Sequence, residues 1–400
     1  MPNESKKLAP GTVVVQRGSE NFLFSIYASD ASKGILLDAA FSKSLIEVLS
    51  GQSELDESLV AELGQILDGQ FYISDSVNRI KEREREATRL VAKWQALQDA
   101  KRGVNNVDFH TSGIVDALDN FDSKETTVSY AYKDAHPTFS GVGYAERFIE
   151  KIVESKFPIN SDTRILEVGG GTGLFAKGLL GYLHGLEISP SYTILDLSPE
   201  LQRSQKQQLS PFAVEFVAGD ATSEISPGIF DLVICNEVIA DFPLSFEESQ
   251  GIVYSGVNNF LYNLYRWLAP DGRAIVTEYF SDAPMAVRLH GHNEYSIDFS
   301  KVADYCATLP FIYEVENLGV WLGALGDTEV LDDVSSDLFA RYICPSIIGR
   351  RLDRRVFPVS EVSFHLGSSL NVVGLTTATV SQYRKCLSPF GFNALLLKKR

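Results

Sequence analysis

One glycine-rich turn constrains the fold of this 400-residue chain more than any other feature. It follows a short apolar run that contains the carboxylate of Glu167, and an apolar helix is expected to begin after it, at Leu174. Glycine permits a tight turn and a close approach of the backbone to a ligand. Such a turn between a strand and a helix brings backbone N–H groups to the mouth of a parallel sheet, where nucleotides bind. The turn therefore predicts an α/β fold with a doubly wound sheet.

The spacing of the glycines indicates which nucleotide binds. A dinucleotide fingerprint needs glycines at the first, third and sixth positions of the turn. Counted from Gly169, the third position is Gly171, but the sixth is Leu174, and no Gly-Lys-Ser/Thr follows. These observations disfavour NAD and exclude a Walker-type phosphate loop. An acid beside the turn suits a ligand with a positively charged end, and S-adenosylmethionine (SAM) has an ammonium and a sulfonium group. We therefore predict SAM as the cofactor.

Polar residues follow the next strands in the same way. Strands are expected at residues 192–197, 214–218, 230–235 and 273–279. Asp196, at the end of the second strand, can accept the two ribose hydroxyls, and Asp220, after the third, can accept from the adenine amino group. The predicted cofactor-binding residues are Glu167, Gly169, Gly171, Gly173, Asp196, Leu197, Asp220, Ala221 and Asn236.

The rest of the chain divides into three parts by pattern. Residues 1–102 predict a strand-plus-helix (α+β) module, for which a winged-helix arrangement and a role in substrate recognition are interpretations. Residues 103–129 read as a polar connector, and residues 130–400 hold the doubly wound sheet. An insertion at about 319–391, helical at about 331–355, is expected before an apolar strand that ends the chain.

Composition narrows the classes of partner. The formal net charge is −16, which opposes binding to nucleic acid. No apolar run reaches transmembrane length, no secretory leader is visible, and the four cysteines are too far apart for a zinc ribbon. We expect a cytoplasmic protein without membrane insertion, and we expect no metal ion. The sequence leaves the oligomeric state open.

With these segments placed, the chain from about 130 to 400 resembles the class I SAM-dependent methyltransferases. More narrowly it resembles the MidA family, which includes a mitochondrial protein-arginine methyltransferase that assists assembly of respiratory complex I. The resemblance implies a seven-stranded Rossmann-like sheet whose last strand is antiparallel and lies beside the fifth. Ala240-Asp241 reverses the family's usual order, so the resemblance supports the methyl donor more than an arginine acceptor. The matching stretches are residues 167–173, 192–199, 236–243, 295–300 and 318–326.

The predicted catalytic residues follow the fourth strand and a later loop. Glu237 and Asp241 are expected beside the transferable methyl group, where either can hold a cationic acceptor or take a proton. The alternative for Asp241 is a cap of the turn before Pro243. His290, His292 and Glu294 alternate, so they share a face if extended. His292 is the candidate general base, and a metal site or a hydrogen-bonded loop are the alternatives.

These residues predict a methyltransferase that acts on a side chain or terminus of a protein or peptide. One alternative is a tailoring O- or N-methyltransferase of a small natural-product metabolite. Another is a non-catalytic assembly factor that retains the fold, although intact Glu167, Asp196 and Asp220 argue against it.

Overall fold

The chain divides into two compact units. Unit 1 comprises residues 1–87 and 328–387, and unit 2 comprises residues 88–327 and 388–400. The predicted functional division at residues 102 and 129 stays a prediction. The computed structural model describes residues 7–8, 12–17, 19–25, 35–66, 72–73, 75–115, 127–289, 291–325, 330–331, 357–358, 371–373, 384–385 and 388–400.

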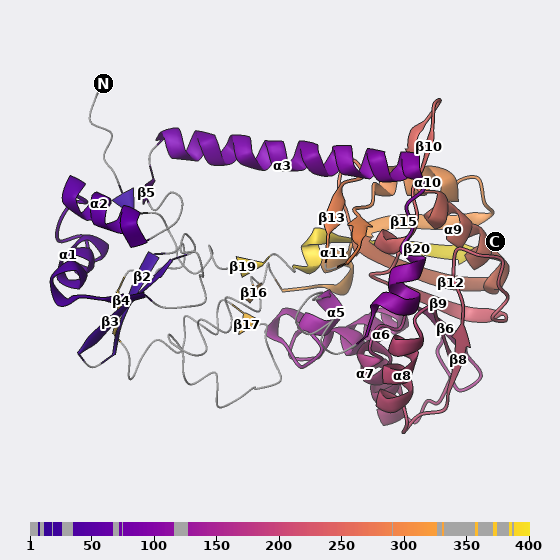
Figure 1. Ribbon diagram of the computed structural model, residues 1–400. Helices are drawn as coiled ribbons and strands as arrows, with labels where there is room; N and C mark the ends of the chain where they lie inside the picture. The colour runs from indigo at the N-terminus through magenta and orange to yellow at the C-terminus, as the bar shows by residue number, and fades with distance from the viewer. Residues whose placement is uncertain are drawn as a thin grey trace. The chain divides into compact units, whose positions relative to one another are not determined.

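Unit 1 is built around a four-stranded antiparallel sheet with the order β18-β2-β3-β4. Its strands are β2 (Thr12–Arg17), β3 (Glu20–Ser25), β4 (Ile35–Leu37) and β18 (Asn371–Val373). Figure 1 shows the helices α1 (Ala39–Leu49) and α2 (Glu57–Ile66) beside this sheet. They bury Phe41, Leu45, Leu59 and Leu63 in one cluster with Val14 and Leu23. Asp38 caps α1, because its carboxylate accepts the N–H groups of Ala40 and Phe41, each at 2.9 Å. Both strands and helices, the two kinds of element predicted for residues 1–102, are present here.

Five short strands complete the described part of unit 1. Strand β1 pairs with β5, and β16 pairs with β17 and β19. The helix predicted at about 331–355 lies, apart from its first residue, outside the described residues. The bounds are β1 (Lys7–Leu8), β5 (Tyr72–Ile73), β16 (Val330–Leu331), β17 (Phe357–Pro358) and β19 (Arg384–Lys385).

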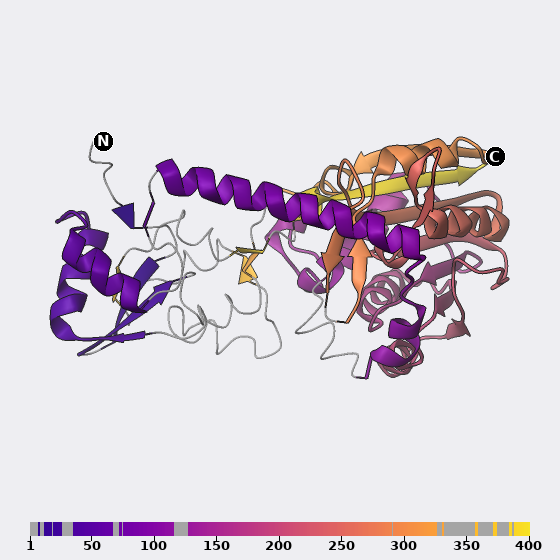
Figure 2. The same ribbon diagram turned by 45° about the horizontal axis from the view of Figure 1, so that its top comes forward.

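Unit 2 contains a seven-stranded sheet with the order β15-β20-β12-β9-β6-β7-β8. Five neighbouring strands run parallel, and β20, yellow in Figure 2, is antiparallel to both β12 and β15. This order confirms the predicted seven-stranded, doubly wound α/β sheet with its last strand beside the fifth. The strands are β6 (Arg164–Val168), β7 (Ser191–Asp196), β8 (Val214–Ala218), β9 (Phe230–Asn236), β12 (Leu268–Tyr279), β15 (Phe311–Asn317) and β20 (Phe392–Lys399).

Helices cover both faces of this sheet. Figure 1 shows α6 (Tyr144–Glu154), α7 (Leu174–Gly185) and α8 (Pro199–Gln208) on one face. The other face carries α9 (Ser255–Trp267) and α10 (Phe299–Cys306). Helix α7, for instance, turns an apolar stripe inward and buries Phe175, Ala176, Leu179, Leu180 and Leu183. In the described residues, no helix is both long and apolar enough to cross a bilayer.

Smaller elements surround the ends of the strands. Helix α3 (Asp75–Arg102) begins in unit 1 and ends in unit 2. The hairpin of β13 and β14 and the short helices η1 and η4 carry the side chains discussed below. The remaining bounds are η1 (Phe109–Gly113), α5 (Val128–Ala131), η3 (Pro137–Phe139), η4 (Ile239–Asp241), β10 (Ser245–Glu247), β11 (Gly251–Val253), β13 (Ala286–Arg288), β14 (Asn293–Tyr295), α11 (Leu318–Leu322) and η6 (Pro389–Gly391).

Candidate functional site

The register of the parallel strands brings the predicted cofactor residues to one edge of the sheet. Val168, the last residue of β6, pairs with Leu195 of β7 and with Cys235 of β9. Asp196 and Asn236 are the next residues along those two strands, so both lie beside the glycine turn. This is the edge at which ligands bind in doubly wound sheets.

The glycine turn has backbone conformations that favour glycine. Gly169, Gly171 and Gly173 have φ values of 71°, 51° and 90°, in the left-handed region. A Cβ on Gly169 would lie 2.4 Å from the Val238 side chain, so the turn packs directly on the loop after β9. A Cβ on Gly171 would meet no described atom within 4 Å. The open side of Gly171 fits the close approach of a nucleotide ligand.

The three predicted cofactor carboxylates differ in their surroundings. Glu167 is buried and accepts a hydrogen bond from the Tyr192 hydroxyl at 2.9 Å, and burial raises its pKa to about 8. Asp196 is also buried, which raises its pKa, while it accepts from Ser198 N–H at 2.8 Å and from Gln205 Nε2 at 2.7 Å. Asp220 accepts from the backbone N–H and the hydroxyl of Thr222, each at 2.7 Å. Their roles toward SAM stay predictions.

The other predicted cofactor residues lie at the same strand ends. Leu197, directly after β7, is half-buried, and Ala221, after β8, is buried. Asn236 ends β9, and its Oδ1 accepts from the hydroxyls of Tyr144 at 2.7 Å and Thr277 at 2.8 Å. These two hydrogen bonds fix the orientation of the amide.

Glu237 follows β9 with a left-handed backbone, φ 56°. Its carboxylate accepts the N–H groups of Val128 at 2.8 Å and Ser129 at 3.1 Å, at the start of α5. Burial raises the pKa of Glu237, and these two hydrogen bonds act in the opposite direction. A left-handed non-glycine residue is strained unless its surroundings hold it, so the contacts with α5 stabilise this conformation. In this structure the carboxylate that we predicted for the acceptor holds a neighbouring segment.

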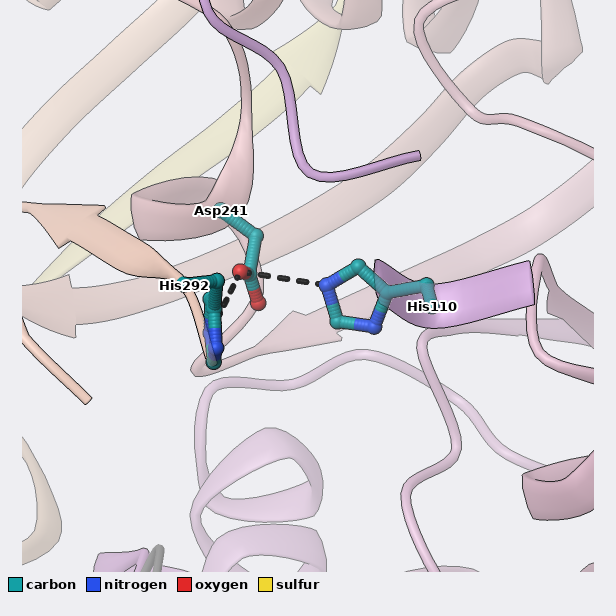
Figure 3. A group of neighbouring side chains, drawn as sticks. All are labelled: His110, Asp241 and His292. Atoms are coloured by element: carbon teal, nitrogen blue, oxygen red, sulfur yellow. Dashed lines mark ion pairs between the residues drawn. The ribbon is translucent and has the colours of Figure 1, made fainter. Parts of the chain in front are cut away.

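Asp241 forms a cluster with two histidines, which we call the acceptor-side cluster: His110, Asp241 and His292 (Figure 3). Asp241 Oδ1 lies 3.1 Å from His110 Nε2 and 3.2 Å from His292 Nε2. Burial acts to raise the pKa of Asp241, but contacts with the two imidazoles outweigh it and hold that pKa below its usual range. Burial likewise acts to lower the pKa of His110, and Asp241 outweighs it, so that pKa is raised.

The three members of this cluster come from distant parts of unit 2. Asp241 ends η4, the turn that follows β9, and its backbone N–H donates to Val238 O at 3.1 Å. His110 belongs to η1, which has the π-helical pattern often found at functional sites. His292 lies on the hairpin between β13 and β14. Asp196, the predicted ribose carboxylate, also acts electrostatically to raise the pKa of His110, and His110 acts to lower that of Asp196.

Two side chains from the stretch that carries His110 hold the other two members of the cluster in place. The Phe109 ring stacks on His292 with centroids 4.0 Å apart and an interplanar angle of 19°. Asn106 Nδ2 donates to Asp241 Oδ1 at 3.0 Å and to Asn293 O at 2.8 Å. One amide therefore ties the turn after β9 to the hairpin that carries His292.

The sequence analysis missed His110, Asn106 and Phe109. They lie in the polar stretch that was interpreted as a connector, and no spacing links them to Asp241 or His292. The only local signal is that Asn106, Phe109 and His110 lie close together in the sequence, between two polar stretches. His290, the other predicted histidine, lies outside the described residues. Glu294 Oε1 is 3.8 Å from His292 Nε2, at the border of the cluster.

Comparison with known proteins indicates the same class of protein as the sheet and the glycine turn do. Residues 142–326 match the family model described as a methyltransferase domain. Unit 2 therefore carries a class I SAM-dependent methyltransferase domain. The protein is a SAM-dependent methyltransferase, and SAM is its cofactor. The narrower resemblance to the MidA family stays a prediction.

Solved structures give more distant likenesses. Phosphoethanolamine N-methyltransferase 2 of Haemonchus contortus is 15% identical, with 72% of this chain and 60% of that chain covered and a TM-score of 0.37. A SAM-dependent methyltransferase of Clostridium acetobutylicum is 11% identical, covering 64% and 90%, with a TM-score of 0.35. The N-methyltransferase NodS of Bradyrhizobium japonicum is 16% identical, covering 43% and 76%, with a TM-score of 0.30. They are too distant to indicate an acceptor. No curated protein matches the chain significantly.

Proposed function

We propose that this methyltransferase transfers the methyl group of SAM to an oxygen or nitrogen nucleophile bound beside the acceptor-side cluster. The observation that carries the proposal is the convergence of His110 and His292 on one carboxylate oxygen of Asp241, at 3.1 and 3.2 Å. The interaction of His110 with Asp196, the predicted ribose carboxylate, supports a location next to the cofactor.

The reaction needs an aligned nucleophile that loses a proton. SAM supplies an electrophilic methyl carbon: the acceptor lone pair forms the new bond to it, and the electrons of the broken C–S bond remain on sulfur. A neutral hydroxyl or a protonated amine must give up one proton. A cluster of two imidazoles and one carboxylate offers acceptors for that proton and fixes the direction of the nucleophile.

We propose a peptide or protein side chain or terminus as the leading acceptor, because unit 1 provides a separate folded surface for a larger substrate. A small metabolite is the second candidate. It is favoured by the burial of the cluster, in which the His292 side chain is 2% exposed and that of Asp241 is 17% exposed.

Substitution of Asp241 tests the role of the cluster. We expect Asp241→Asn to lower turnover by about 10²–10⁴-fold, the usual contribution of a positioned acid–base group. SAM affinity, measured separately by calorimetry, should change less than threefold. Asp271→Asn is the matched control, because Asp271 is exposed and pairs only with Lys398 at 2.9 Å among the described residues. Full turnover in Asp241→Asn, with Asp271→Asn as reference, would show that the chemistry does not use this cluster.

Acceptor identity can be measured with the same two variants. A host extract is separated by size into a macromolecular and a small-molecule fraction, and each is incubated with SAM labelled in its methyl group. A product that gains one CH₂ with wild-type enzyme and with Asp271→Asn, but not with Asp241→Asn, is the product of this site. If this product appears in the macromolecular fraction, the acceptor is a peptide or protein; if it appears in the small-molecule fraction, the acceptor is a metabolite.

A further inference from the structure

We propose that His110, Asp241 and His292 bind one divalent transition-metal ion, of which zinc is the representative. All three side chains belong to unit 2, and one ligand atom from each lies within 4.8 Å of the others. Both imidazoles turn Nε2 toward the same carboxylate oxygen (Figure 3).

The two separations from Asp241 Oδ1 fit a shared ion, and all three ligand atoms lie within 4.8 Å of one another. Zinc lies about 2.0–2.1 Å from an imidazole nitrogen and about 2.0–2.2 Å from a carboxylate oxygen. Two such ligands at a right angle or a tetrahedral angle are therefore about 3.0–3.5 Å apart. The observed separations from Asp241 Oδ1, 3.1 Å to His110 and 3.2 Å to His292, fall in this range. In the described part of the chain, buried His110 Nε2 makes no well-aligned hydrogen bond, although it lies this close to the carboxylate.

The donor set also fits. Two neutral imidazoles and one carboxylate are the protein ligands of many catalytic metal sites, which keep further positions open for water or substrate. The three ligands carry a net charge of −1 against the +2 of the ion, so a positive charge remains for an anionic oxygen. The carboxylate of Glu294, 3.8 Å from His292 Nε2, adds negative potential at the border of the cluster.

Neighbouring side chains orient the three proposed ligands through hydrogen bonds and stacking, as groups next to the ligands do in known metal sites. Asn106 Nδ2 donates to Asp241 Oδ1 at 3.0 Å, which directs the carboxylate. Phe109 stacks on the ring of His292. Asp99 of α3 accepts from Asn293 Nδ2 at 2.9 Å and from the Tyr295 hydroxyl at 3.1 Å, which anchors the hairpin that carries His292.

The role of the ion rests on the proposed function, whereas its binding does not. An ion held by these three side chains would bind the acceptor oxygen through an open position. A bound divalent metal would lower the pKa of a coordinated hydroxyl, whose proton would then pass to solvent because the imidazoles and the carboxylate are engaged as ligands. The acceptor class that this implies is an alcohol, phenol or carboxylate, in preference to an amine that stays protonated.

Metal binding can be measured without an acceptor. The full chain is stripped with a chelator, dialysed, and titrated with zinc by calorimetry. Cobalt(II) is added in parallel to give a visible absorption band whose intensity reports the geometry. We expect one ion per chain, with His110→Ala and His292→Ala each weakening zinc binding at least 100-fold. His184→Ala is the matched control, because His184 is an exposed histidine at the end of α7.

The outcomes separate the two proposals. SAM binding by each variant verifies that unit 2 is folded, and the milder His110→Gln is used if His110→Ala fails this check. Absence of zinc binding by wild-type protein, or equal binding by wild type and both histidine variants, would overturn the metal site. If zinc fails to bind and Asp241→Asn still abolishes turnover, the proposed function stands without the metal. If zinc binds and Asp241→Asn retains full turnover, the ion is structural and the proposed function is wrong.

Discussion

The cofactor side and the acceptor side of unit 2 are built in different ways. On the cofactor side, the predicted binding residues lie at the end of a parallel strand or in the turn that follows it, as Gly169 follows β6 and Asp196 ends β7. On the acceptor side, His110 and His292 meet at Asp241 although they are far apart in the chain. The sheet alone determines the first arrangement. The second depends on a helix, a turn and a hairpin that fold against one another.

This difference has a consequence for robustness. The two aspartates of the cofactor side, Asp196 and Asp220, accept hydrogen bonds from residues at most nine positions later in the chain. On the acceptor side, hydrogen bonds between segments carry the geometry, as in the bond from Asn106 Nδ2 to Asp241 Oδ1. A local substitution should therefore affect one function on the cofactor side. On the acceptor side it should affect several groups together.

The largest effect that we expect on the cofactor side follows from Asp196→Ala. Loss of charge-assisted hydrogen bonds to the ribose should cost about 1.5–3 kcal/mol, which is roughly a 10–150-fold loss of SAM affinity. Calorimetric titration with SAM measures this change, and circular dichroism verifies the fold. Asp231→Ala is the control. Asp231 forms an ion pair with Arg164 at the amino ends of β9 and β6, whereas the cofactor residues lie at the carboxyl ends of the strands. Unchanged SAM affinity in folded Asp196→Ala would remove Asp196 from the cofactor site.

The sequence predicted the cofactor side because its signals are local. A glycine turn, a carboxylate at a strand end and the order of strands can be recognised within a few residues of one another, and parallel strands bring their ends together. The full seven-stranded sheet, with β20 antiparallel beside β12, was implied by the resemblance to the class I SAM-dependent methyltransferases and not by these local signals.

The acceptor side could be predicted only in part. Asp241 and His292 were selected because they follow predicted strands or alternate in a loop, but nothing in the sequence indicates that they meet. His110 was missed, because a polar segment gives no periodic signal and its position depends on the stacking of Phe109 on His292. Glu237 was selected for the acceptor, yet its carboxylate accepts the N–H groups at the start of α5. This interaction of Glu237 could not be predicted locally, because its partner Val128 lies more than 100 residues earlier in the chain.

The second prediction compares two glycines near or within the same helix. Gly173, directly before α7, has φ 90°, and a Cβ there would lie 3.0 Å from Gln205 Cα. Gly173→Ala should therefore destabilise the protein by about 1–3 kcal/mol through backbone strain. Gly181 lies within α7, and a Cβ there meets no described atom within 4 Å, so Gly181→Ala should be neutral or stabilise by up to about 1 kcal/mol. Thermal or urea unfolding measures both, and equal stability of the two variants would contradict the strain argument.

The remaining prediction concerns the buried carboxyl of Glu167, whose effect per pH unit is small. Burial raises its pKa to about 8, whereas an unfolded glutamate has a pKa of about 4.3. Between these values the folded state holds a proton that the unfolded state has lost. Stability of the SAM-free protein should therefore fall as pH rises through this window, and the contribution should level off above the folded pKa.

Urea unfolding at several pH values from 5 to 9 measures this contribution, with Glu167→Gln as the variant that cannot ionise. One proton contributes a slope of about 1.4 kcal/mol per pH unit at most, so the wild type should lose about 1 kcal/mol more than Glu167→Gln between pH 6 and 7. The exposed Glu314→Gln should keep the wild-type slope. Saturating SAM should reduce the wild-type slope, because an ammonium group near Glu167 favours its ionised form. A slope that SAM leaves unchanged would place the ammonium elsewhere, and equal slopes in wild type and Glu167→Gln would show that Glu167 ionises normally in the fold.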